Sequence, residues 1–235
     1  MNRLKITLLA ALLILPVFLH GATATSPFPN ESLDYVIQWP SGISLGEAHW
    51  KATNTGTAAN PAWEFSMDFA ADIPAFPLSD TYHSAAAGNY CTLRLGREIQ
   101  HGSRKSSETT EIDTQTKSAT RKTAGGGEST FDVPDCVRDA LTFLFFTRQE
   151  LVNGHVPSPQ TVLLGSPYQV KASNLGDQRI TVGGHQLDAE RVGFDITGPA
   201  SNTTAEVFFA KDAVRTPLRI RIPLPMGAFS LELAR

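Results

Sequence analysis

The residues whose types could best take part in catalysis or binding lie in one segment, 135–151. This segment combines polar side chains with an apolar helical pattern. Asp139 and Thr142 are three positions apart, so a helix would place the carboxylate and the hydroxyl on the same face. Such a pair could take part in catalysis, but these two residue types also form the hydrogen-bond network that begins a helix. We expect this helix-start network at Asp139 and Thr142.

Arg148 is the second candidate in this segment, because it follows a long run of apolar residues. A buried guanidinium needs an acidic side chain or a backbone carbonyl as its partner. Two interpretations follow, a structural ion pair or an anion-binding site, and we expect the ion pair. Phe145 and Phe146 lie beside these polar residues, so the segment also offers a candidate pocket lining or structural network.

Other motifs that would name a reaction are missing from the sequence. No two of the five histidines beyond the first 24 residues have metal-ligand spacing, so we expect neither a metal nor a cofactor; these are His49, His83, His101, His155 and His185. There is no Gly-x-Ser-x-Gly elbow. Gly125-Gly126-Gly127 is not followed by Lys-Ser or Lys-Thr, so it indicates a turn and not a phosphate loop. The sequence favours a protein without enzymatic activity.

Two cysteines, Cys91 and Cys136, are the only ones in the chain. In an oxidising compartment two thiols are most simply interpreted as one disulfide. The loop closed would hold about 45 residues, which corresponds to roughly 4 kcal/mol in the chain-entropy model. The alternative, a reactive or metal-binding pair, lacks CxxC spacing and a neighbouring histidine cluster.

The N-terminus has the three-part pattern of a secretory signal peptide, residues 1–24. Arg3 and Lys5 precede an apolar stretch, and Ala22-Thr23-Ala24 is a small-x-small cleavage site. The alternative is a transmembrane anchor, but the apolar run of about 14 residues is shorter than the roughly 20 needed to span a bilayer. We therefore predict a periplasmic or secreted protein that is soluble, and does not span the membrane, after cleavage.

Composition limits the partners and the number of domains. The net charge of −3 gives no electrostatic case for nucleic acid or an anionic membrane surface. Residues 25–31 contain Pro and Ser and predict a flexible leader. Residues 32–235 are sufficient for one domain with a real core, which we expect to be β-rich.

Period-two alternation is the main pattern in this region, as in 63–69, where aromatic or apolar residues alternate with polar ones. Pro40-Ser41-Gly42, Gly183-Gly184 and Lys211-Asp212 indicate turns. The expected strands are 33–39, 43–50, 63–69, 109–113, 117–122, 160–164, 168–175, 178–184, 186–196, 204–211, 216–222 and 227–233. We expect a mainly β fold, an antiparallel meander that forms a barrel, half-barrel or strongly curved sheet.

One buried apolar helix, about 135–151, interrupts this meander. Pro134 precedes it, Asp135 is the expected N-cap, and Asn153-Gly154 marks its end. A helix this apolar is buried on most of its surface, so it must pack against the curved sheet or plug a barrel mouth. Most of the phenylalanines should form the core, although a half-open barrel would let some of them line an apolar cavity.

Three stretches together resemble an uncharacterised bacterial envelope family, domain of unknown function 3108. They are Tyr35, Trp39 and 42–48; Pro134, Asp139, 141–146, Arg148 and Gly154; and 207–209, Asp212, Arg215, Pro217, Arg219, Gly227 and 231–233. Here Thr142 stands where the family usually has Ser, and Phe145-Phe146 stand where it has tyrosines. The resemblance implies a fold similar to the periplasmic lipoprotein carriers, an antiparallel sheet curled around a helix, and it assigns no activity.

Three functions are compatible with this sequence. The first is a non-enzymatic envelope protein that carries or senses a lipid-like molecule in an apolar cavity. The second is an assembly or interaction factor that binds an envelope protein through edge strands or through the polar segment 100–130. The third is an enzyme that acts on envelope glycan or lipid through Asp139 and Arg148. We favour the first, because the aromatic-rich curved sheet has no catalytic motif.

Overall fold

A computed structural model describes residues 28–57, 59–73, 76–224 and 227–234. The predicted signal peptide, residues 1–24, lies outside the described residues. The chain enters the fold before the expected boundary of its leader, because Phe28 is buried and the first strand begins at Glu31. Both residues are held by the helix, as described below.

The described residues form fifteen strands and one helix, α1 (Ala140–Val152). The strands are β1 Glu31–Gln38, β2 Ser44–Asn54, β3 Ala62–Ile73, β4 Phe76–Ala87, β5 Thr92–His101, β6 Arg104–Asp113, β7 Ser118–Thr123, β8 Glu128–Asp132, β9 Arg138–Asp139, β10 Gln160–Leu163, β11 Pro167–Val182, β12 His185–Thr197, β13 Asn202–Ala210, β14 Pro217–Leu224 and β15 Gly227–Leu233. The predicted fold class, a mainly β meander with one helix, is confirmed.

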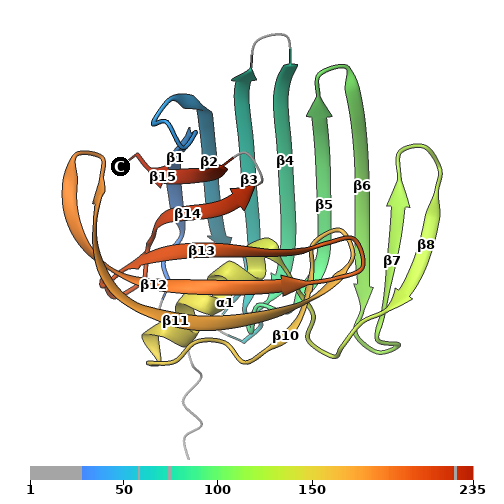
Figure 1. Ribbon diagram of the computed structural model, residues 1–235. Helices are drawn as coiled ribbons and strands as arrows, with labels where there is room; N and C mark the ends of the chain where they lie inside the picture. The colour runs from blue at the N-terminus through green and yellow to red at the C-terminus, as the bar shows by residue number, and fades with distance from the viewer. Residues whose placement is uncertain (1–27, 58, 74–75, 225–226, 235) are drawn as a thin grey trace, which may run out of the picture.

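All strands belong to one sheet, in the order β8-β7-β6-β5-β4-β3-β2-β1-β15-β14-β13-β12-β11-β10-β9. Every pair is antiparallel except β9 with β10. Strand β1 pairs with both β2 and β15, which joins the two halves of the meander. In Figure 1 strands β1–β8 stand upright, β11–β15 cross in front of them, and α1 lies between the two sets. The end strands β8 and β9 are not neighbours, so the sheet is barrel-like without being closed.

The alternation of the sequence sets which face of the sheet is buried. In β2, Ala48, Trp50 and Ala52 are buried, while His49 and Lys51 between them are exposed. Because successive side chains of a strand point to opposite faces, the apolar set lines the inside of the curl. The inner residues of β1–β4 and of β10–β13 form two main clusters, and Leu144 and Phe146 of α1 pack against both.

Four strands, β4, β5, β8 and β9, were not predicted, and β9 lies within the segment expected as helix. Strand β4 ends in Ala85-Ala86-Ala87, where small side chains hide the alternation, and β5 carries charged side chains on both faces, such as Arg94 and Arg97. Strand β11 is also one long strand and not two. A register shift between Asn174 and Asp177 contains Gly176 at a φ of 90°, so the turn-like composition there is a bulge inside a strand.

The helix starts later than predicted, and its N-cap is Asp139 and not Asp135. The residues before it form a turn at Cys136 and then β9, because Cys136 is bonded to Cys91 and the Val137 carbonyl accepts a hydrogen bond of 2.9 Å from the Thr92 amide. The backbone therefore cannot turn into a helix until it has passed Val137. The helix ends as expected at Asn153, followed by Gly154 at a φ of 90°.

Candidate functional site

An apolar cavity of about 430 Å³ lies inside the curl of the sheet, beside the first turns of α1. Its wall combines side chains from both halves of the sheet with the helix. Six of its apolar lining residues are Trp50, Met67, Phe69, Phe143, Phe194 and Leu231. The cavity thus lies where the two sets of strands in Figure 1 face each other across α1.

One row of inner-face residues runs across the cavity wall from strand to strand. The register places Trp50 beside Met67, Met67 beside Tyr82, Tyr82 beside Arg97, and Arg97 beside Glu108. All five residues line the cavity. The row is therefore apolar at its β2 end and charged at its β6 end.

The charged end of this row is an ion pair. Arg97 Nε lies 2.9 Å from Glu108 Oε1, and the two side chains are 33% and 15% exposed. The guanidinium also lies against Gly165, where an added Cβ would be 3.2 Å from Nη1. Gly165 has a φ of 85°, and its carbonyl accepts a 2.7 Å hydrogen bond from Arg121 Nη1. Two arginines of the inner face thus meet at one glycine.

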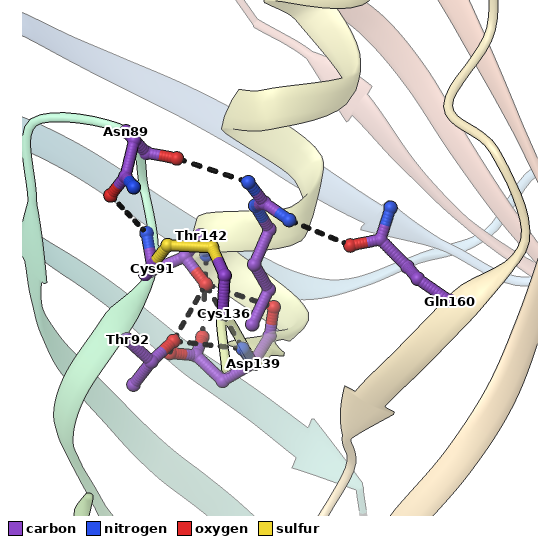
Figure 2. Close-up of a disulfide and its surroundings, with 8 residues drawn as sticks. Asn89, Cys91, Thr92, Cys136, Asp139, Thr142 and Gln160 are labelled. Atoms are coloured by element: carbon purple, nitrogen blue, oxygen red, sulfur yellow. Dashed lines mark hydrogen bonds between the residues drawn. A yellow bond between two sulfur atoms is a disulfide. The ribbon is translucent and has the colours of Figure 1, made fainter. Parts of the chain in front are cut away.

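Asp139 lines the cavity at the start of α1, but both oxygens of its carboxylate accept hydrogen bonds from the protein. Asp139 Oδ1 accepts hydrogen bonds from the Leu141 and Thr142 amides, at 2.8 and 3.3 Å, and Oδ2 accepts one from the Thr92 hydroxyl at 2.8 Å. The Thr142 hydroxyl completes a capping box with the Asp139 amide at 3.0 Å. Figure 2 shows this network beside the disulfide.

Burial raises the pKa of the Asp139 carboxyl, and hydrogen bonds from Ser84, Thr92 and the two helix amides oppose that rise. Asp139 is 3% exposed and Thr142 is fully buried. A catalytic pair would need one of these groups free to meet a substrate, whereas both serve to begin the helix.

The predicted disulfide between Cys91 and Cys136 is confirmed, and it ties the start of β5 to the segment before α1. Arg138 lies on the other side of this junction. Its Nη2 donates to the Asn89 carbonyl at 3.0 Å and its Nη1 to the Gln160 side chain at 2.8 Å. Its guanidinium, whose pKa is lowered by burial to about 10, lies 3.6 Å from the centre of the Phe146 ring. Figure 2 labels the two partners, Asn89 and Gln160.

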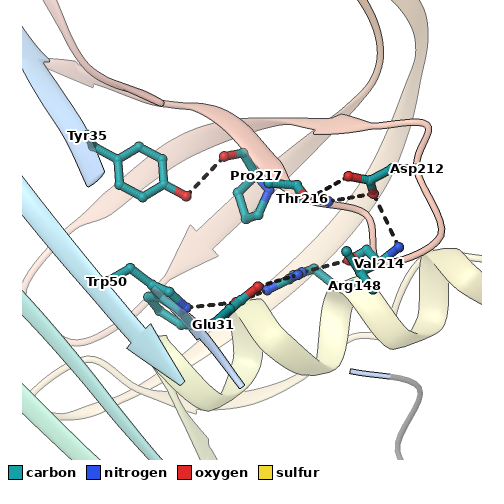
Figure 3. A network of polar contacts seen from close by, with 8 residues as sticks. All are labelled: Glu31, Tyr35, Trp50, Arg148, Asp212, Val214, Thr216 and Pro217. Carbon is teal, nitrogen blue, oxygen red and sulfur yellow. Dashed lines mark hydrogen bonds and ion pairs between the residues drawn. The ribbon is translucent and has the colours of Figure 1, made fainter. Parts of the chain in front are cut away.

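Arg148 is fully buried and forms an ion pair with Glu31 at the start of β1. Its Nη1 and Nη2 donate to the two oxygens of Glu31, the second at 3.0 Å, and its Nε donates to the Val214 carbonyl at 2.9 Å. Trp50 Nε1 donates to Glu31 Oε1 at 2.9 Å. Figure 3 shows how this network joins β1, β2, α1 and the β13–β14 turn. The guanidinium is used for structure, with the Phe28 ring on one side at 5.0 Å.

Hydrogen bonds within the β13–β14 turn hold the backbone where the Val214 carbonyl contacts Arg148. Asp212 accepts hydrogen bonds from the Val214 amide at 3.2 Å and from the Thr216 hydroxyl at 2.6 Å. Arg215 takes a φ of 50° within this turn. Lys211-Asp212, expected as a turn, is thus the start of a loop that supports the buried ion pair (Figure 3).

Of the five helix residues predicted as a pocket or network, the structure places only Asp139 on the cavity wall. Phe145 is fully buried among aromatic rings, including Trp63 and Phe65 at 5.0 Å each. Phe146 is stacked on Arg138. An enzyme acting through Asp139 and Arg148 would need both groups in one cleft, and Arg148 does not line the cavity within the described residues.

Sequence reasoning missed Arg97 and Glu108, although one signal was available. Gly102-Ser103 is a two-residue turn between β5 and β6 that pairs His101 with Arg104. A two-residue turn fixes the register of the whole hairpin, and residues equally far from it, such as Arg97 and Glu108, must then face each other. The turn was not recognised because Gly-Ser is a weaker hairpin signal than Asn-Gly.

Within the part of the chain that the structure describes, no group of three or more His, Cys, Asp or Glu side chains is placed to hold a metal ion. Among the same residues, α1 included, no helix has the length and apolar character needed to cross a membrane.

Comparison with known proteins gives a family and a fold. The family model described as "Protein of unknown function (DUF3108)" matches residues 34–234. The chain is similar in structure to a beta-barrel-like protein of domain of unknown function DUF1849 from Brucella abortus, with a TM-score of 0.59 and 8% sequence identity, over 87% of this chain and 95% of that one. No curated protein matches the chain. At this identity the likeness shows the fold alone.

Proposed function

Because this chain belongs to the DUF3108 family of proteins of unknown function, we propose its role from its own geometry: it binds a lipophilic molecule of the cell envelope in the cavity beside α1. In this role it acts as a carrier or sensor in the periplasm, and it catalyses no reaction. The signal-peptide pattern of residues 1–24 and the Cys91–Cys136 disulfide support the compartment, since disulfides persist in oxidising environments.

The observation that carries the proposal is the apolar cavity itself. Its volume of about 430 Å³ lies within the roughly 300–1,000 Å³ of ordinary small-molecule sites. Protein interiors are otherwise packed with few voids larger than a water molecule. A space of this size, lined by side chains such as Met67, Phe143 and Phe194, is therefore suited to an alkyl chain.

The first experiment measures affinity against chain length. Each methylene buried adds about 0.8 kcal/mol, or roughly fourfold in affinity. As probes we choose alkyl compounds of about 8, 10 and 12 carbons. Calorimetric titration should therefore show affinity rising with chain length. Native mass spectrometry after gentle purification should show a bound lipid. Affinity independent of chain length, or no binding at all, would refute the proposal.

A cavity-filling variant provides the matched control. Ala205 of β13 lines the cavity and faces Phe194 of β12. Ala205→Phe should occupy the space and abolish binding. Thr204→Phe places the same side chain one position away, on the exposed face of the strand, and should leave binding unchanged. Equal binding by both variants would show that the ligand site lies elsewhere.

A second candidate function is the binding of an envelope protein through an edge of the sheet. Strand β8 ends the sheet and pairs only with β7 among the described strands. An unpaired strand edge can accept a strand from a partner. Thr130→Lys on β8 should then abolish capture of partners from envelope extracts, whereas Thr203→Lys on β13 should not. Unchanged capture by Thr130→Lys would count against this function.

A further inference from the structure

The charged end of the cavity wall has an arginine whose outer amino groups are unused. Arg97 lines the cavity, and it contacts Glu108 through Nε. Among the described residues, Nη1 and Nη2 of Arg97 have no hydrogen-bonding partner. The guanidinium is one-third exposed, so these two nitrogens can still donate to a molecule in the cavity.

A second guanidinium, that of Arg121, lies near these nitrogens. Arg121 approaches the same Gly165 from β7, two strands away from β5, and, among the described residues, has no carboxylate as a partner. The backbone of Gly165 thus lies between two guanidinium groups, while Glu108 supplies one carboxylate. The charged lining residues include Arg97, Glu108 and Asp139, and Arg121 lies beyond the lining, where it adds a second guanidinium beside Gly165.

Glu108 also favours one direction of the Arg97 side chain, through the ion pair at Nε. Because the carboxylate lies 2.9 Å from Nε, it favours an orientation of the planar guanidinium that leaves the Nη1–Nη2 edge as a pair of donors. Gly165 permits this arrangement, since a Cβ at that position would come within 3.2 Å of Nη1. Such a fork of donors matches the two oxygens of a carboxylate or phosphate.

From this arrangement we propose that the ligand is an anionic amphiphile, whose carboxylate or phosphate head binds Arg97 while its alkyl chain extends along Tyr82 and Met67 toward Trp50. This assignment rests on the proposed function, because it names the class of molecule that occupies the same cavity. The row from Glu108 to Trp50 provides both parts in the required order, a charged end and an apolar end.

The test compares dodecanoate with dodecanol and with acetate by calorimetric titration at pH 7. Wild-type protein should bind dodecanoate more tightly than dodecanol, and acetate more weakly than either. Arg97→Gln should weaken dodecanoate binding by about tenfold or more, as expected for loss of a charge-assisted hydrogen bond, and should leave dodecanol binding unchanged. The control is Arg94→Gln, an exposed arginine on the opposite face of β5, which should change neither.

A second variant tests the inference in the opposite direction and covers the case in which Arg97→Gln does not fold. Glu108→Gln removes the competing carboxylate, so it should strengthen dodecanoate binding several-fold without affecting dodecanol. If wild-type protein binds neither alkyl compound, the proposed function itself fails. If it binds both equally and neither Arg97→Gln nor Glu108→Gln changes the dodecanoate affinity, the proposed lipophilic site is supported. The proposal that its ligand has an anionic head is then refuted. Acetate binding as tight as that of dodecanoate would mean a free-anion site and would also refute it.

Discussion

At the scale of single residues, Asp139 is a buried carboxyl whose pKa is raised by burial above the ordinary value of 3.8. The folded state therefore holds the proton more tightly than the unfolded chain. The stability that the protonated Asp139 carboxyl contributes is fully present below pH 3.8, and it is lost as the pH rises through the raised pKa. Asp139→Asn keeps an Oδ1 acceptor for the Leu141 and Thr142 amides but carries no charge at any pH.

The difference in free energy of unfolding, Asp139→Asn minus wild type, should therefore shift in favour of Asn as the pH rises from 3 to 7. Urea unfolding at each pH measures it, since the other carboxyls titrate alike in both proteins. Asp113→Asn is the control of opposite sign, because hydrogen bonds from the Thr116 and Gln115 amides lower the pKa of Asp113. A constant difference for Asp139→Asn would contradict the prediction.

The buried pair of Arg148 and Glu31 supports a second prediction at this scale. Arg148→Met leaves the Glu31 carboxylate, 11% exposed, without its cation, and should cost about 3–5 kcal/mol of stability. The double variant Glu31→Gln/Arg148→Met should recover much of this loss, because Gln is neutral and still accepts from Trp50 Nε1. A double-mutant cycle by urea unfolding measures the coupling.

An exposed ion pair is the comparison for this cycle. Arg179 and Asp188 are 65% and 62% exposed, and exposed pairs contribute little because water and salt screen them. Arg179→Met should change stability far less than Arg148→Met. Additive effects of the Glu31 and Arg148 substitutions would show that the ion pair is not the source of the loss.

At the scale of elements, the disulfide joins β5 to the start of α1 and closes a loop with a sequence separation of 45. Loop closure on this scale corresponds to about 4 kcal/mol. Cys91→Ala/Cys136→Ala should lose stability of that order in urea unfolding. The amides of residues 136–139 should also exchange faster with solvent, because the bond holds this segment against the start of β5. A loss of a few tenths of a kcal/mol would mean that packing alone fixes the junction.

The helix and most strands could be predicted from the sequence, because their apolar periodicity is strong. The start of α1 could not, since Asp135 and Asp139 are equally suitable N-cap residues. The choice between them depends on the tether at Cys136 and on the pairing of β9 with β10, and both are long-range contacts. Arg97 and Glu108 also depend on strand register, which a slip of one residue would reverse.

At the scale of the whole molecule, the two ends of the curled sheet are joined by side-chain and hydrogen-bond contacts. They are not joined by pairing of the end strands β8 and β9. Leu163 packs in a cluster with Ala119 of β7, and the Gly165 carbonyl accepts a hydrogen bond from Arg121. These contacts hold the segment after β10 against the inner face of β5–β7. The cavity lies beside this contact, since Gly165 is part of its lining.

This closure gives the last prediction, which concerns local opening. Arg121→Ala removes a hydrogen bond between a charged group and a carbonyl, worth about 1.5–3 kcal/mol, from the contact that spans the gap. Amides of β7 and β8 should exchange about tenfold faster or more, while those of β1 and β15, in the centre of the sheet, should not change. Lys122→Ala, the exposed neighbour, is the control. An equal increase in every strand would mean that Arg121 stabilises the fold globally.

Because Gly165 also lines the cavity, a purely local opening should in addition speed the release of a bound alkyl ligand, which links the edge of the sheet to the proposed function.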